Sequence, residues 1–149
     1  MWIGDDMNRT DESLKALVGI KRSNDTIDRI VKQDMKNYGL NITEFAVMEL
    51  LFHKGDQPIQ KVKQRILIAS SSTTYVIDQL VKKGYVRRRQ DTKDKRITYA
   101  VLTDEGHKLM ENIFPKYAET IANAFSILDD EELAILRRAL KKISAMSNE

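Results

Sequence analysis

The first forty residues carry a helical pattern of apolar positions. Between Asp11 and Tyr38, apolar residues recur at spacings of three, four and seven, which is the period of an amphipathic helix. Gly39 follows the last turn, where a glycine can adopt the left-handed conformation that ends a helix. We therefore predict one long helix over residues 11–38 with a single apolar face.

A second helix follows and carries apolar residues on nearly every side. Asn41 or Thr43 can cap its start, and His53 and Lys54 place cations near its end, before Gly55. A helix that is apolar all round belongs in the middle of a fold, so this helix is expected at the centre of the core.

The next stretch predicts a short helix, a turn and another helix. Pro58 suits the first turn of the short helix, because proline has no N–H to lose there and its φ is already helical. A cluster of small hydroxyl residues over 70–74 begins the following helix, and Gly84 ends it. Two helices joined in this way form a helix-turn-helix.

The hydrophobic period changes after Gly84. Residues 85–89 and 97–102 have the β-branched and aromatic content of strands, and the polar segment 90–95 joins them. A charged β-hairpin is therefore expected directly after the helix-turn-helix.

Two helices complete the chain. Thr103 caps the first, which contains Pro115 and should bend there because proline removes a backbone donor. Asp129 and Glu132 match a capping box for the last helix.

These elements together predict a mainly α fold with a small β-hairpin wing (α+β). The winged helix-turn-helix occupies residues 40–103. It is flanked by an N-terminal extension and dimerisation helix over 1–39 and by C-terminal dimerisation helices over 104–149.

The charge distribution supports this division. Residues 1–39 carry no net charge, residues 40–103 carry +6 and residues 104–149 carry −3. A basic segment between neutral and acidic ends is expected of a central module that binds a polyanion.

Several function classes are disfavoured by what the sequence lacks. It has no cysteine and only two histidines, His53 and His107, far apart, so a metal site is not expected. Without a glycine-rich phosphate loop or a nucleophile motif, neither an enzyme nor a cofactor is expected. No apolar run approaches the roughly 20 residues that span a bilayer, and the start does not resemble a signal peptide. We expect a cytoplasmic protein without membrane association.

Residues 80–106 have the sequence LVKKGYVRRRQDTKDKRITYAVLTDEG. This stretch resembles the core of the MarR family of transcriptional regulators. In that family a recognition helix ends in Lys-Gly, the wing carries Asp-x-x-Asp followed by basic residues, and Leu-Thr-x-x-Gly opens the next helix. The resemblance covers nearly the whole chain and implies a homodimer that binds double-stranded DNA. It also implies a response to small aromatic, phenolic or quinone-like compounds.

The predicted recognition helix presents hydroxyl, amide and cationic side chains away from its apolar face. Short hydroxyls at a helix N-terminus let phosphate approach the backbone N–H groups, and Gln79 can contact adenine edges in the major groove. Taken alone, such a cluster is more often a helix cap and a polar face, but the basic hairpin beside it favours DNA. The candidate DNA-binding residues of this helix are Ser70, Ser71, Ser72, Thr74, Tyr75, Gln79 and Lys82.

The hairpin supplies the predicted wing, which could enter the minor groove. The arginines of 87–89 alternate along a strand, so they cannot all face the same way. Asp91 and Asp94 are assigned to holding the turn or orienting Arg96, and a solvated hairpin tip without DNA contact is the alternative. The candidate wing contacts are Arg89, Lys93, Lys95 and Arg96.

Apolar stripes near both ends of the chain predict a dimer interface. One short chain would struggle to cover both stripes, although packing within a chain is the commoner explanation of such a pattern. The candidate dimerisation residues are Leu14, Leu17, Val18, Leu133, Leu136, Leu140 and Ile143.

The family resemblance also implies an effector pocket between the dimerisation helices and the winged domain. Apolar residues at helical spacing more often belong to a packed core, so the sequence leaves both interpretations open. The candidate effector residues are Met48, Phe52, Met110, Phe114 and Tyr117.

These features favour a sequence-specific transcriptional regulator, a repressor released from a pseudo-palindromic operator by a small aromatic ligand. Its half-sites should lie about 10 base pairs apart, or a small multiple of that. The alternative is a winged-helix module that binds protein or RNA without a specific operator. Such a module should expose an apolar patch on the fourth helix, where this sequence has hydroxyls and amides.

Overall fold

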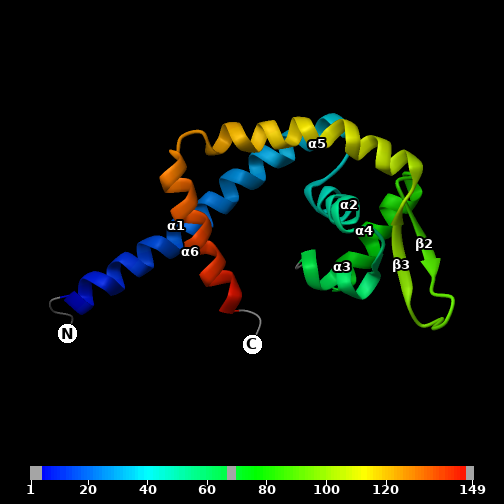
Figure 1. The fold of residues 1–149 in the computed structure, drawn as a ribbon, viewed down its shortest axis with the longest axis horizontal. Coiled ribbons are helices and arrows are strands. Elements are labelled where there is room, and N and C mark those ends of the chain that lie inside the picture. Colours follow the sequence, from blue (N-terminus) through cyan, green and yellow to red (C-terminus); the bar gives the residue numbers. More distant parts are fainter. Residues whose placement is uncertain (1–4, 67–69, 147–149) are drawn as a thin grey trace. The chain divides into compact units, whose positions relative to one another are not determined.

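The structure is a computed structural model that describes residues 5–66 and 70–146, except for the side chains of residues 5–7, 70 and 71. It forms two compact units, residues 1–113 and 114–149. The first unit contains α1 (Asp5–Met35), η1 (Lys36–Tyr38), α2 (Ile42–Lys54), β1 (Gln57–Pro58), α3 (Ile59–Ile66), α4 (Ser70–Lys82), β2 (Val86–Gln90) and β3 (Thr98–Leu102) (Figure 1). Helix α5 (Asp104–Phe125) begins in the first unit and ends in the second, which also contains α6 (Asp130–Ala145). The predicted fold class is confirmed.

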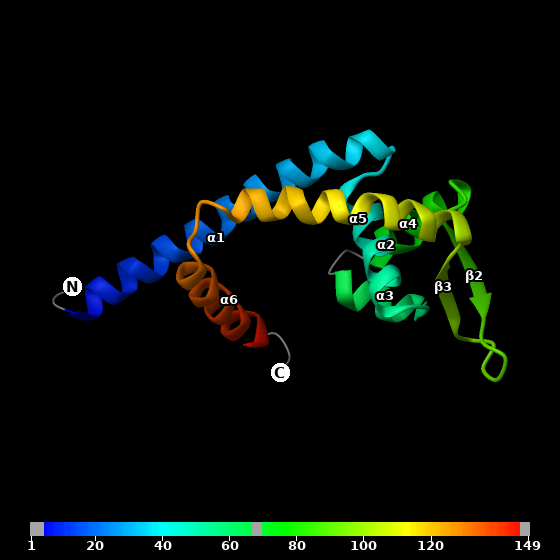
Figure 2. The ribbon, with the colours of Figure 1, turned by 45° about the horizontal axis from the view of Figure 1, so that its top comes forward.

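Helix α1 packs on α2 only through its C-terminal turns. Val31 and Met35 are buried there, whereas the described side chains before residue 27 are mostly exposed. Gly39 adopts a φ of 67° after η1, and the N–H of Leu40 donates to the carbonyl of Met35 at 3.3 Å. The rest of α1 extends away from α2, α3 and α4, as both ribbon views show (Figures 1 and 2). The helix begins at Asp5, earlier than predicted.

Helix α2 forms the centre of the first unit, as its apolar circumference predicts. Asn41 caps it: the Asn41 side chain accepts from the Glu44 N–H at 2.8 Å, and the Asn41 N–H donates to Glu44 Oε1 at 3.0 Å. This reciprocal capping box settles the choice between Asn41 and Thr43. The buried apolar residues of α2 are Phe45, Val47, Met48 and Leu51.

The wing belongs to a three-stranded antiparallel sheet in the order β1-β3-β2. Val86 lies opposite Leu102, and Gln90 lies opposite Thr98. The prediction that Pro58 lies in the first turn of a helix is wrong: Pro58 belongs to β1, opposite Tyr99 of β3, and α3 begins at the next residue. A two-residue strand has no hydrophobic period to detect, and an edge position tolerates proline.

The segment Leu-Thr-x-x-Gly joins the sheet to α5. The hydroxyl of Thr103 donates to the carbonyl of Gly84 at 2.6 Å and accepts from the N–H of Gly106 at 3.0 Å. A Cβ on Gly106 would lie 2.1 Å from the carbonyl oxygen of Tyr85, so no side chain fits there. This motif therefore has a structural role at the C-terminal end of α4.

The second unit contains the C-terminal part of α5 and α6. Helix α5 continues through Pro115. A capping box begins α6: the Asp129 carboxylate accepts from the Glu132 N–H at 2.8 Å, and Glu132 Oε1 accepts from the Asp129 N–H at 3.1 Å. None of the helices over the described residues is long and apolar enough to cross a membrane.

Candidate nucleic-acid interface

Helix α4 has one buried face and one polar face. Thr73, Ile77 and Leu80 are fully buried against the rest of the first unit. Tyr75 is 64% exposed, although it is a large aromatic residue. The side chains of Ser70 and Ser71 lie outside the described residues. Of the other predicted contacts on this helix, Gln79 is half-buried and the exposed ones are Ser72, Thr74 and Lys82.

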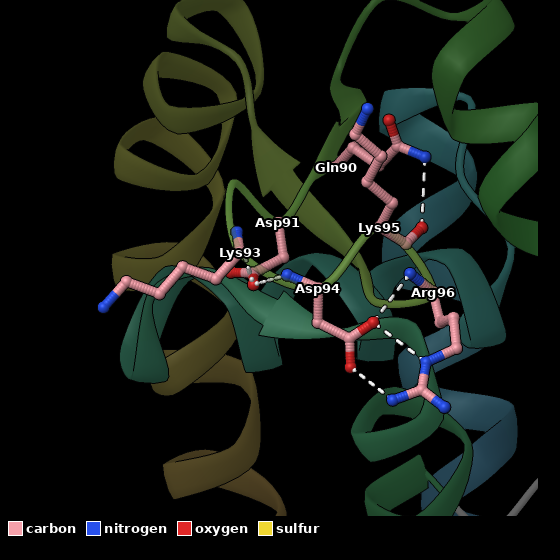
Figure 3. A network of polar contacts seen from close by, with 6 residues as sticks. All are labelled: Gln90, Asp91, Lys93, Asp94, Lys95 and Arg96. Carbon is pink, nitrogen blue, oxygen red and sulfur yellow. Dashed lines mark hydrogen bonds and ion pairs between the residues drawn. The ribbon is translucent and has the colours of Figure 1, made fainter.

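Two aspartates order the tip of the wing, the loop between β2 and β3 (Figure 3). Asp91 Oδ2 accepts from the backbone N–H groups of Lys93 at 3.2 Å and Asp94 at 2.8 Å. Asp94 accepts from the Arg96 backbone N–H and, with both carboxylate oxygens, from the Arg96 guanidinium at 3.0 Å. Hydrogen bonds from the Arg96 side chain and backbone lower the pKa of Asp94 below its ordinary value. The carboxylates therefore fix the loop and orient Arg96.

The wing tip presents three cations to solvent. Lys93, Lys95 and Arg96 are exposed, and Arg96 has 90% of its side-chain surface accessible despite its ion pair. The Gln90 amide donates to the carbonyl of Lys95 at 3.1 Å, which ties the two arms of the loop together. An ordered and positively charged tip of this kind can contact DNA phosphate without first ordering the loop.

The three arginines of β2 have different surroundings. Arg88 pairs with Asp78 of α4, and the Arg89 guanidinium lies 4.5 Å from the Tyr99 ring centre and 3.3 Å from Asp56 Oδ2. The predicted DNA contact Arg89 is therefore held by partners within the chain. Asp56 is 33 residues away, and Tyr99 lies opposite Arg89 in a strand register that the sequence alone did not specify.

Helix α3 adds positive charge that the sequence interpretation missed. Its eight residues include Lys61, Lys63 and Arg65 and no acidic residue. In a helix-turn-helix the first helix crosses the DNA backbone, so cations on α3 are suited to phosphate contacts. The signal was present as three cations in the short segment IQKVKQRI.

An ion pair with a buried carboxylate and a partly exposed ammonium lies at the C-terminal end of α4. Lys83 Nζ lies 2.9 Å from Glu44 Oε1, 2.8 Å from Glu44 Oε2 and 2.8 Å from the carbonyl oxygen of Gly39. The Glu44 side chain is 4% exposed and that of Lys83 is 35% exposed. The sequence shows Glu44 as the third residue of a helix but does not show its partner, which is 39 residues away.

The predicted effector residues are divided between the two units. Met48 and Met110 are fully buried in the first unit. The Phe52 ring centre, in the same unit, lies 5.3 Å from that of His53 and 5.2 Å from that of His107. The other two, Phe114 and Tyr117, belong to the second unit, and their ring centres are 6.1 Å apart.

A pocket of about 390 Å³ lies between α2 and α3. Apolar residues line part of it, and the basic residues His53, Lys54 and Arg65 also contribute to the lining. Burial raises the pKa of the Glu49 carboxyl in this pocket, and the charge of His53 partly opposes the rise. The remaining lining residues are Ala46, Leu50 and Ile66.

The predicted dimerisation residues form apolar surface in both units. On α1, Leu14 is 59% exposed, Leu17 47% and Val18 46%. On α6, Leu133 and Leu136 are half-buried, whereas Leu140 and Ile143 are exposed. Each helix therefore presents apolar side chains that the described part of its own unit does not cover.

The chain is similar to known transcriptional regulators. Residues 40–98 match the MarR family. The HTH-type transcriptional regulator MhqR of Bacillus subtilis is 40% identical to the chain over 134 residues, which cover 90% of this chain and 92% of MhqR. The chain belongs to the MarR family. It is a DNA-binding transcriptional regulator, and the family consists of regulators rather than enzymes, as predicted.

Solved structures agree on the fold. AbsC, a MarR-family transcriptional regulator from Streptomyces coelicolor, matches with a TM-score of 0.84 and 20% identity, over 99% of this chain and 98% of AbsC. BpsR of Bordetella bronchiseptica, whose DNA binding is regulated by 6-hydroxynicotinic acid, matches with a TM-score of 0.79 and 22% identity. That match covers 87% of this chain and 98% of BpsR. At these identities the likeness shows the winged-helix fold of MarR regulators.

Proposed function

We propose that this MarR-family regulator is a repressor that binds a pseudo-palindromic DNA site as a homodimer. The observation that carries the proposal is the polar outer face of α4 beside an ordered, basic wing. The exposed Ser72, Thr74 and Tyr75 lie in the N-terminal half of α4, and Lys93, Lys95 and Arg96 lie at the wing tip. A recognition helix of this composition fits the major groove, and the wing fits the adjacent backbone or minor groove.

Tyr75 and Gln79 are the leading candidates for base contacts. They lie four residues apart on α4, so both occupy one face of the helix. The Gln79 amide can form two hydrogen bonds to adenine, and the exposed Tyr75 ring can contact a thymine methyl group. The cations of α3 and the wing supply contacts that do not depend on sequence.

The exposed apolar side chains of α1 and α6 support the proposed homodimer. A charge placed in such a surface should dissociate the dimer, because the buried carboxylate would lack a partner. Leu17→Glu and Leu140→Glu are expected to shift the mass measured by light scattering from dimer to monomer. Ile97→Glu, at an exposed apolar residue of the wing and outside both helices, is the control that should stay dimeric. A dimer that survived both test substitutions would contradict this part of the proposal.

A small aromatic, phenolic or quinone-like effector is proposed to release the DNA. The pocket between α2 and α3 supports this, since its volume falls within the usual range for small-ligand sites and it combines apolar walls with a few polar groups. Its occupant would contact α3, which precedes α4 in the helix-turn-helix. Ala46→Leu should narrow the pocket and weaken the response to phenols and quinones while DNA affinity is kept. An unchanged response would place the effector elsewhere.

The DNA-binding proposal is tested by selecting bound fragments from a pool of random duplexes at two salt concentrations. Recovery of a pseudo-palindrome with half-sites about 10 base pairs apart, or a small multiple, is the expected result. Uniform binding that only weakens with salt would instead favour an interaction module without a specific operator.

A further inference from the structure

Lys83 is the residue at which three parts of the first unit meet. It directly follows the last residue of α4, and its ammonium lies within 2.9 Å of both oxygens of Glu44 and of the Gly39 carbonyl oxygen. Glu44 lies in the first turn of α2, and Gly39 ends the segment that follows α1. The three donor hydrogens of a lysine ammonium match these three acceptors in number.

The Glu44 carboxylate is held firmly enough to act as an anchor. It is nearly fully buried, and Oε1 also accepts from the N–H of Asn41 in the capping box of α2. A buried carboxylate without a cation is strongly unfavourable, so Lys83 and Glu44 stay together while the unit is folded. The pair therefore holds the C-terminal end of α4 against the start of α2 and against Gly39, which follows η1.

The opposite end of α4 carries the proposed DNA contacts. The helix has 13 residues and is about 20 Å long, so a tilt of about 10° at its C-terminal end would displace the N-terminal turn by about 3 Å. That displacement is as large as a hydrogen bond and would break base contacts. DNA binding by the N-terminal half of α4 is therefore sensitive to the contacts that hold its C-terminal end.

We propose that Lys83 is a positioning residue for DNA recognition, which acts through Glu44 and Gly39 and does not contact phosphate. The proposal rests on the proposed interface of α4. Gly39 ends η1, which directly follows α1. The contact between Lys83 and Gly39 therefore links the orientation of α4 to the long N-terminal helix.

Two substitutions separate positioning from a general electrostatic effect. Lys83→Met removes a positive charge, whereas Glu44→Gln removes a negative charge and keeps a side chain that suits the capping box. An electrostatic effect on DNA binding would weaken it in the first variant and strengthen it in the second. Positioning predicts weaker binding in both, by about tenfold.

The measurement is DNA affinity against salt concentration, with the active fraction determined by stoichiometric titration and folding checked by circular dichroism. Both variants should give lines parallel to the wild-type line but displaced to weaker binding, because no phosphate contact is lost. The double variant should be no weaker than either single one, since both remove the same contact. Lys83→Arg should restore most of the affinity, and Lys108→Met, at an exposed lysine of α5, is the charge-matched control.

Three results would overturn the proposal. If the folded variants bound DNA with wild-type affinity, the ion pair would stabilise the fold without positioning α4 for DNA. A shallower salt dependence in Lys83→Met would make Lys83 a phosphate contact. Opposite changes in the two single variants would indicate long-range electrostatics. If Tyr75→Ala and Arg96→Ala also left affinity unchanged, the α4 and wing interface itself would be wrong, and the two failures can be told apart.

Discussion

Two ion pairs of the winged domain each join a carboxylate to a cationic side chain and differ in burial. Lys83 and Glu44 meet at the inner end of α4, where the carboxylate is 4% exposed. Asp94 and Arg96 meet at the wing tip, where the guanidinium is 90% exposed (Figure 3). Water screens the second pair and leaves its cation accessible, whereas the first is shielded and holds helices together. Burial thus separates a contact that fixes the fold from one that can bind a partner.

The largest effect is expected at the buried pair. Lys83→Met should lower the free energy of unfolding by about 2 to 3 kcal/mol, less than for a fully buried pair because Lys83 is partly exposed. Arg96→Ala should change it far less, because water screens the exposed pair. Urea unfolding monitored by circular dichroism measures both. An equal loss of unfolding free energy in the two variants would mean that burial does not distinguish the two ion pairs.

The next largest effect is expected on the outer face of α4. Gln79→Ala should reduce discrimination at one base pair of each half-site by about 1 to 3 kcal/mol. Binding to unrelated duplexes should stay the same, because phosphate contacts are untouched. Competition between the selected operator and single-base variants provides the measurement. A uniform loss over all sequences would remove Gln79 from the base contacts.

A smaller effect is expected from Glu49, whose pKa is raised by burial. Because the carboxyl is more easily protonated in the folded chain, its stabilising contribution is present below the unfolded pKa and is lost as pH rises through the folded value. Glu49→Gln should therefore be slightly more stable than wild type at pH 7, by no more than about 0.5 kcal/mol because solvent reaches the group. The gain should vanish near pH 4. Unfolding curves at the two pH values test this, and a destabilised variant at pH 7 would contradict it.

The smallest effect concerns Asp94, whose pKa is lowered chiefly by its hydrogen bond from the Arg96 side chain. Its contribution to stability is present above the unfolded pKa and is lost as pH falls through the lower folded value. Arg96→Ala should return the pKa of Asp94 toward the ordinary value of about 3.9. Carboxyl chemical shifts followed by NMR through an acid titration would show this. An unchanged titration would mean that the Arg96 side chain does not set this pKa in solution.

The sequence predicted elements whose cause is local. Gly39, the Asp129 capping box and the change of period after Gly84 act within a few residues, and the structure contains the helix ends and strands that they indicate. The short strand β1 was missed because two residues, one of them Pro58, show no alternation. The start of α1 also differs from the prediction, since the helix begins at Asp5 and not at residue 11.

The contacts that order the candidate site depend on distant partners. Arg89 stays a predicted DNA contact, and its position beside Asp56 and Tyr99 follows from the sheet and the loop before β1. Glu44 and Lys83 could each be placed on an element, yet only the packing of α2 against α4 brings them together. Sequence patterns therefore predict which residues share a helix face and cannot specify pairs across the core.

The most direct test of the account compares DNA affinity over a range of salt concentrations for the wild type, Arg96→Ala and Glu44→Gln. The account predicts a shallower line for Arg96→Ala, with the slope reduced by about one for each wing that contacts phosphate. It predicts a line parallel to wild type and displaced to weaker binding for Glu44→Gln. A wild-type slope for Arg96→Ala, or wild-type or stronger binding by Glu44→Gln, would contradict the assignment of binding to the exposed pair and positioning to the buried one.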